Sequence, residues 1–239
     1  MQPCESPGMI PEKRNTETVM TEFKKSTAMS TQRILISLFI FLLMPAIRFL
    51  IRNWIGNDTL ALMFALNFCV WLLIIYDWEL FGLHWLRAKA NIPDTLLYSF
   101  IGMIVIFIWT YVDLHFLRGT VLLPNPADIR RYPIAYPAVI IAFSFSLSAL
   151  VNITFKCVTD HFKMHAGEAI MILISGFLFG FVYTICITPA RPALFFPTYL
   201  YNVILICALS YLYNQTHSFI PGILAMGTAY LILTILILF

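Results

Sequence analysis

Charged residues are scarce in this chain of 239 residues. Only 11% of the positions hold Asp, Glu, Lys or Arg, against about 25% in a typical soluble domain. The apolar residues Ala, Val, Ile, Leu, Met, Phe, Trp, Tyr and Cys make up 60% of the chain, and the mean hydropathy is +0.84. Such a chain has too little polar surface to coat a water-soluble globule, so we expect no sizeable soluble domain.

The chain also lacks the cysteine and charge patterns of several functional classes. Its five cysteines never form a Cys-x-x-Cys pair, and three of them lie inside apolar runs. Scattered cysteines of this kind are usually small buried hydrophobic residues, so neither a disulfide framework nor a cysteine-based zinc site is predicted. The 15 lysines and arginines are dispersed, so no basic surface for nucleic acid is predicted.

Long apolar runs are what the sequence has in abundance. A helix that crosses a bilayer needs about 20 mostly apolar residues, so seven helices use about 140 positions, and about 143 apolar residues are present. We therefore predict an all-α polytopic transmembrane helical bundle of about seven spans, or six if the last two segments are partly re-entrant. The expected spans are 34–51 (interrupted by Pro45), 59–76, 95–112, 136–155, 169–187, 196–213 and 220–239.

Two parts are expected along the chain, a polar N-terminal tail at 1–33 and a transmembrane helical domain at 34–239. The tail has mixed charges and no apolar run of the secretory-signal kind. With the N-terminus inside, the cytoplasmic side carries nine lysines and arginines and the opposite side six. This excess favours a cytoplasmic tail under the positive-inside rule.

Titratable side chains avoid the middle of the expected spans. All twelve acids and five histidines lie in the tail, in loops or within about one turn of a span end. Ionisable groups at depth are costly and mark ion pathways or proton relays. We therefore expect the bundle interior to hold no titratable group able to move protons, which disfavours proton-coupled transport and acid–base catalysis.

One interfacial cluster has the spacing of metal ligands. Between the fourth and fifth spans, His161 and His165 stand four residues apart, so on a helix they share one face. Glu168 can then serve as a third ligand. The alternative interpretation is an ordinary solvated loop. No cofactor is predicted, while a metal ion or a histidine-bound pigment stays open.

Two other polar clusters lie at span ends. The second span is followed by a group that can form a polar site: Asp77, Glu79, His84 and Arg87. The alternative is an ordinary interfacial anchor, because the tryptophans in this segment, Trp78 and Trp85, are typical of the aromatic belt. Asp113 and His115, at the end of the third span, form a weaker cluster.

Uncharged polar residues and small residues inside the spans indicate helix packing. The polar residues are Asn67, Asn152, Thr154, Tyr183 and Asn202. Such groups usually hydrogen-bond between helices. Gly176 and Gly180 form a Gly-x-x-x-Gly pattern, which is typical of two helices in close contact.

Three segments in the C-terminal part share an order of features with a known family. They are 150–156 (LVNITFK), 174–183 (ISGFLFGFVY) with its Phe-Gly pair, and 211–226 (YLYNQTHSFIPGILAM) with a Thr-x-Ser-x-x-Pro turn. In this order the chain resembles the CPBP family of CAAX proteases and bacteriocin-processing enzymes, also called the Abi family. The resemblance covers about residues 148–239 and implies a CPBP-like helical half and a bacterial inner (plasma) membrane location.

The chain departs from that family at the catalytic positions. The resemblance places Val151 and Asn152 at the two family glutamates, Lys156 at the arginine, Tyr183 at the first histidine and Met226 at the second. The family asparagine is also missing, with Ala229 or Tyr230 nearby. Family members are understood to use a glutamate to activate water, and the replacements cannot act as a general base near neutral pH. The resemblance therefore implies a degenerate, non-catalytic member.

Three functional hypotheses follow. The first is a non-catalytic CPBP-like subunit, scaffold or regulator that binds another integral membrane protein, surrounded by lipid. Asn152, Tyr183 and Met226 would line the partner cleft, or they are merely helix-packing residues. The second hypothesis is a transporter or channel component. The third is an enzyme, either a metal-dependent one using His161, His165 and Glu168 or a divergent intramembrane protease.

Overall fold

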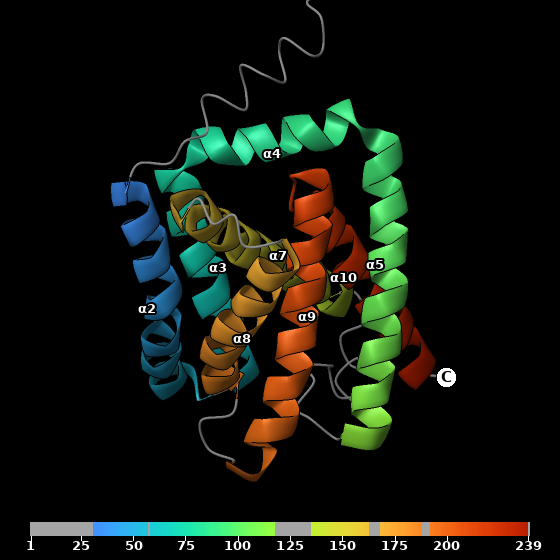
Figure 1. Ribbon diagram of the computed structural model, residues 1–239. Helices are drawn as coiled ribbons and strands as arrows, with labels where there is room; N and C mark the ends of the chain where they lie inside the picture. The colour runs from blue at the N-terminus through green and yellow to red at the C-terminus, as the bar shows by residue number, and fades with distance from the viewer. Residues whose placement is uncertain (1–30, 57, 118–134, 163–167, 188–191, 239) are drawn as a thin grey trace, which may run out of the picture.

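The computed structural model describes residues 31–56, 58–117, 135–162, 168–187 and 192–238, and all regular structure within them is helical. Figure 1 shows the arrangement. The long helices are α2 (Thr31–Ile55), α3 (Asp58–Tyr76), α5 (Ile92–Val112), α7 (Ala135–Phe162), α8 (Glu168–Ile187), α9 (Phe195–Thr216) and α10 (Ile220–Leu238). The short elements are α4 (Trp78–Ala90), the π-helical turn η1 (Asp113–Leu117) and the 3-10 turn η2 (Pro192–Leu194).

The long helices coincide with the seven apolar runs, which confirms the all-α prediction. Within the described residues, three segments are long and apolar enough to cross a membrane: Leu35–Ile55, Ile92–Phe116 and Phe195–Thr216. A fourth results if the bent pair α3 and α4 is taken as one span. The protein is therefore integral to a membrane, and the count of seven spans stays a prediction.

Several helix bounds differ from the expected spans. α2 runs from Thr31 to Ile55 and continues through Pro45, which was expected to interrupt it. Proline is tolerated inside membrane helices because neighbouring groups satisfy the freed backbone carbonyl. α7 extends to Phe162, seven residues beyond the expected end at 155.

The largest departure concerns the segment between the second and third expected spans, which is helical rather than a loop. α3 ends at Tyr76, and after Asp77 the chain continues as α4 at 89° to the direction of α3. Asn91 ends α4, and Pro93 lies in the first turn of α5, where its missing N–H costs no hydrogen bond. Figure 1 shows α4 lying across one end of the bundle, between the ends of α3 and α5.

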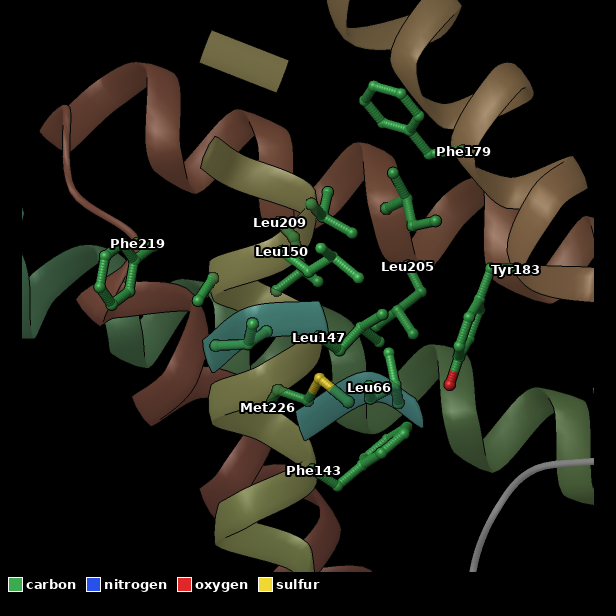
Figure 2. Close-up of a cluster of buried hydrophobic side chains, with 14 of the residues drawn as sticks. Leu66, Phe143, Leu147, Leu150, Phe179, Tyr183, Leu205, Leu209, Phe219 and Met226 are labelled. Carbon is green, nitrogen blue, oxygen red and sulfur yellow. The ribbon is translucent and has the colours of Figure 1, made fainter. Parts of the chain in front are cut away.

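The core is built from large apolar side chains of the long helices. Figure 2 shows part of it, including Leu147 and Leu150 of α7 with Leu205 and Leu209 of α9. The opposite faces of the same helices expose apolar residues to the outside. Inward and outward apolar faces together are typical of helices that pack on protein on one side and on lipid on the other.

Two glycines allow α8 to approach α9 closely. A Cβ atom on Gly180 would lie 3.1 Å from the backbone nitrogen of Val203, and one on Gly176 would lie 3.0 Å from the Val203 carbonyl oxygen. The close packing predicted from the Gly-x-x-x-Gly pattern is confirmed.

Candidate functional site

Several ionisable side chains near the span ends are buried. Among the described residues, those with little or no exposed surface include Arg48, Asp77, His84 and Asp113. The expectation that no titratable group moves protons in the interior stays a prediction. Asp77, His84 and Asp113 do lie near span ends in the sequence. They are buried because α4 and η1 continue the chain across the end of the bundle as helix instead of leaving it as a solvated loop.

One polar group, the turn cluster, joins α4 to the turn between α9 and α10. It consists of His84, Arg87, His217, Ser218 and Phe219. His84 Nδ1 and Arg87 Nη1 each lie 3.2 Å from the carbonyl oxygen of His217. A carbonyl only accepts, so both side chains donate, and this fixes the proton of a neutral His84 on Nδ1. Ser218 Oγ donates in return to the backbone carbonyl of His84 at 2.9 Å.

The backbone of the turn is shaped for these contacts. His217 ends α9 in the left-handed region, with φ of 52°, and its N–H donates to the Tyr213 carbonyl at 2.6 Å. A left-handed residue at this position is a common way to end a helix, and histidine adopts it more readily than a β-branched residue would. The reversal turns the His217 carbonyl toward α4, where the two donors meet it.

Phe219 inserts from the same turn into the core. Its side chain is fully buried, with ring centroids 5.3 Å from Phe81 and 5.1 Å from His84. Its carbonyl oxygen accepts a hydrogen bond from Ser148 Oγ of α7 at 3.0 Å. Figure 2 shows Phe219 at the edge of the buried cluster. The turn is therefore held by α4 on one side and by α7 on the other.

The three predicted cleft residues lie inside the closed core. Asn152, Tyr183 and Met226 have 0%, 2% and 0% of their surface exposed, and Figure 2 shows Tyr183 and Met226 among the packed side chains. Asn152 Nδ2 donates to Ser148 Oγ at 3.2 Å, within α7. Its Oδ1 has no hydrogen-bond partner within the described residues. A partner could reach these side chains only if the helices separated.

A second polar group, the tyrosine cluster, lies inside the bundle near the C-terminal end of α5. It consists of Thr110, Asp113, Tyr201 and Tyr230. The Tyr201 hydroxyl lies 2.9 Å from Thr110 Oγ1 and 2.7 Å from the Tyr230 hydroxyl, so α5, α9 and α10 share one chain of hydrogen bonds. Trp109 Nε1 adds a donor to the Tyr201 carbonyl at 3.2 Å.

Asp113 brings a carboxylate to this cluster. It begins η1, is fully buried, and lies within electrostatic range of the Tyr201 and Tyr230 hydroxyls. π-Helical turns often occur at functional sites. His115, the other residue of the predicted pair, is exposed. Its Nδ1 lies 3.0 Å from the Tyr111 carbonyl oxygen, one turn earlier in the chain. The structure therefore separates Asp113 from His115.

Sequence reasoning missed Thr110, Tyr201 and Tyr230 as a group. Threonine and tyrosine are common in membrane helices, and residues from three helices meet only after packing. The signal that could have pointed to them was Asp113, an acid next to an apolar run.

The predicted helix-bonding role of two asparagines is confirmed. Ser146 Oγ of α7 donates to Asn67 Oδ1 of α3 at 2.9 Å. Asn202 Nδ2 of α9 donates to Thr184 Oγ1 of α8 at the same distance. These bonds connect neighbouring helices and stabilise their packing.

The remaining predicted residues fall largely outside the described part. His165 lies outside the described residues altogether. The side chains of five other predicted residues are also outside them: Glu79, Thr154, Lys156, His161 and Glu168. Among the side chains that the structure does describe, no group of three or more His, Cys, Asp or Glu could hold a metal ion. The metal hypothesis for His161, His165 and Glu168 stays a prediction.

Comparison with protein-family models, with curated proteins and with solved structures gives no match. The CPBP-like character of residues 148–239 therefore stays a prediction from the sequence.

Proposed function

We propose that this chain is a non-catalytic, CPBP-like integral membrane protein that binds another membrane protein as a subunit, scaffold or regulator. The observation that carries the proposal is the position of Val151, Asn152, Tyr183 and Met226, which the resemblance places at catalytic sites. All four are buried in the packed core. The family mechanism needs water and a peptide bond to reach a general base, and these side chains offer neither access nor a suitable group.

The use of interior polar groups supports the same proposal. Ser148 bonds the Phe219 carbonyl, Asn202 bonds Thr184, and Tyr201 bonds Tyr230. Each of these bonds connects two helices, or a helix and a turn, so the polar atoms hold the bundle in one packing. A rigid apolar bundle is suited to present a fixed outer surface to a second membrane protein.

The test is purification of the tagged full-length chain from membranes of its native host in a mild detergent. The expected result is co-elution with a second membrane protein in fixed molar ratio through affinity and size-exclusion steps. Gly180→Ala, which disturbs the packing of α8 on α9, is the matched disruptive variant, and Gly82→Ala, in open space on α4, is the control. Recovery of the unaltered chain as a clean monomer contradicts the proposal.

The tyrosine cluster favours a second candidate, a transporter or channel component. The fully buried Asp113 lies within electrostatic range of the Tyr201 and Tyr230 hydroxyls, and an acid with hydroxyls has the composition of a proton relay. The test is proton flux into liposomes that contain the purified chain, followed with a pH-sensitive dye under an imposed potential. This candidate expects flux that Asp113→Asn abolishes, and flux no faster than in empty liposomes removes it.

A further inference from the structure

Three tryptophans follow one another at intervals of seven residues. Trp71 lies on α3, Trp78 begins α4 and Trp85 lies further along α4, with exposed fractions of 55%, 66% and 60%. Seven residues advance a helix by about 10 Å and return to nearly the same face. In one unbroken helix the three indoles would descend through the bilayer by about 20 Å.

The right-angle bend at Asp77 divides this series. The two helices on either side of it differ in direction by 89°. If α3 crosses the bilayer, α4 lies in the membrane plane, at the level where α3 ends and α5 begins. Trp71 and Trp78 then differ in depth, whereas Trp78 and Trp85 lie at the same depth.

The two faces of α4 have different surroundings. The inner face holds the buried His84 and Ala88, and His84 is hydrogen-bonded to His217 and Ser218 of the α9–α10 turn. The outer face exposes Trp78, Trp85, Leu86 and Lys89. Indole rings together with a lysine ammonium are typical of the headgroup layer, where one part of the side chain meets hydrocarbon and another meets phosphate and water.

The outer face of α4 is also continuous with the apolar outer surface of its neighbours. Ile75 of α3 is exposed just before the bend, and Ile92 and Leu96 of α5 are exposed just after α4 ends. The surface that faces lipid chains on α3 and α5 therefore leads directly onto α4. This continuity and the cationic Lys89 favour phospholipid as the occupant.

We propose that α4 is an interfacial helix whose outer face, Trp78, Trp85, Leu86 and Lys89, binds phospholipid headgroups of the leaflet in which α3 ends. The Lys89 ammonium contacts lipid phosphate and the indoles lie at the boundary between headgroups and acyl chains. Because the inner face holds the α9–α10 turn, the same helix connects the membrane surface to the packing of α9 and α10.

The test is the depth of each indole in phosphatidylcholine nanodiscs that contain the full-length chain. Three variants keep Trp109 and one of Trp71, Trp78 or Trp85, with the other tryptophans replaced by Phe. Trp109 is retained because its indole donates to the Tyr201 carbonyl, and a variant with Trp109 alone supplies the signal to subtract. Depth is read from quenching by lipids with bromine high or low on the acyl chains and by lipids with a nitroxide on the headgroup.

The expected result is equal, shallow depth for Trp78 and Trp85, with headgroup nitroxide the strongest quencher, and a depth about 9 Å greater for Trp71. The depth difference between Trp71 and Trp78 is the internal control for the depth difference between Trp78 and Trp85, because both pairs are seven residues apart. A Trp85 about 10 Å deeper than Trp78 overturns the proposal, since α4 would then enter the membrane. A Trp85 quenched only by aqueous iodide, or shielded from lipid and water alike, also overturns it.

Discussion

The imidazole Nδ1 of His84 lies 3.2 Å from the carbonyl oxygen of His217, a residue 133 positions later in the chain. This contact joins α4 to the turn between α9 and α10, and Ser218 returns a hydrogen bond to the His84 carbonyl. The end of the bundle is therefore closed by a pair of reciprocal bonds between distant segments.

Replacement of His84 by Phe is expected to lower the free energy of unfolding by about 1 kcal/mol. Phenylalanine keeps an aromatic ring between Tyr213 and Phe219 but donates no hydrogen bond to His217. The measurement is unfolding of the purified chain in detergent, followed by helical circular dichroism. Trp85→Phe, on the exposed face of the same helix, is the control and is expected to change the value by less than about 0.5 kcal/mol. Equal losses of unfolding free energy in the two variants would contradict a stabilising contact between His84 and the α9–α10 turn.

Ser148 and Asn152, one turn apart on α7, are expected to differ in their contributions. Ser148→Ala removes one of the two donors to the Phe219 carbonyl, which keeps the Ile223 N–H. It also leaves Asn152 Nδ2 without its acceptor. The expected cost is about 1–2 kcal/mol. Asn152→Leu removes the hydrogen bond from Nδ2 to Ser148 Oγ together with an Oδ1 that has no partner within the described residues. The two changes offset each other, so the net effect is expected to be close to zero. Unfolding of both variants under the same conditions provides the comparison. A larger loss for Asn152→Leu than for Ser148→Ala would contradict the assignment.

The same change of Gly to Ala is expected to have opposite signs at two positions. A Cβ on Gly180 meets the backbone of Val203 at 3.1 Å, and backbone atoms cannot move aside by changing rotamer, so α8 and α9 must separate. We expect a loss of about 1–3 kcal/mol. A Cβ on Gly82 meets nothing within 4 Å, and Ala favours the helix by about 0.5–1 kcal/mol. Similar thermal stabilities for the two variants would exclude this account of α8–α9 packing.

The hydroxyls of Tyr201 and Tyr230 are expected to be energetically coupled. Their separation of 2.7 Å predicts a coupling energy of about 0.5–1.5 kcal/mol in a double-mutant cycle of the two Tyr→Phe substitutions. Tyr201→Phe combined with Tyr211→Phe is the control cycle, because ten helical residues place these two side chains about 15 Å apart along α9. If the free-energy changes of Tyr201→Phe and Tyr230→Phe are additive, the two hydroxyls do not act together and the tyrosine cluster is not an energetic unit.

The membrane class and the long helices could be predicted because they depend on local composition. Runs of about 20 apolar residues are sufficient to define a candidate span, and Gly176 and Gly180 were enough to predict close packing. The helical segment α4 was missed because it is short and mixes charges, tryptophans and apolar residues, as loops of membrane proteins also do.

The interior polar groups could be predicted only in part. Asp77, His84 and Asp113 were noted as polar residues at span ends, but their burial depends on where α4 and η1 turn. Tyr201 and Tyr230 carry no sequence signal of their own beyond the nearby acid Asp113, since their contact requires α9 and α10 to pack at one register. Long-range contacts of this kind follow from tertiary packing rather than from spacing along the chain.

The most direct test of the central claim is photo-crosslinking from the outer surface of the bundle in native membranes. Phe39 of α2, Phe100 of α5 and Phe177 of α8 are more than half exposed, and each is replaced in turn by benzoylphenylalanine. Phe41, which is buried on α2, is the control position. The account predicts an adduct of one discrete protein mass from at least one exposed position and none from Phe41. Adducts with lipid alone at all three exposed positions would contradict it.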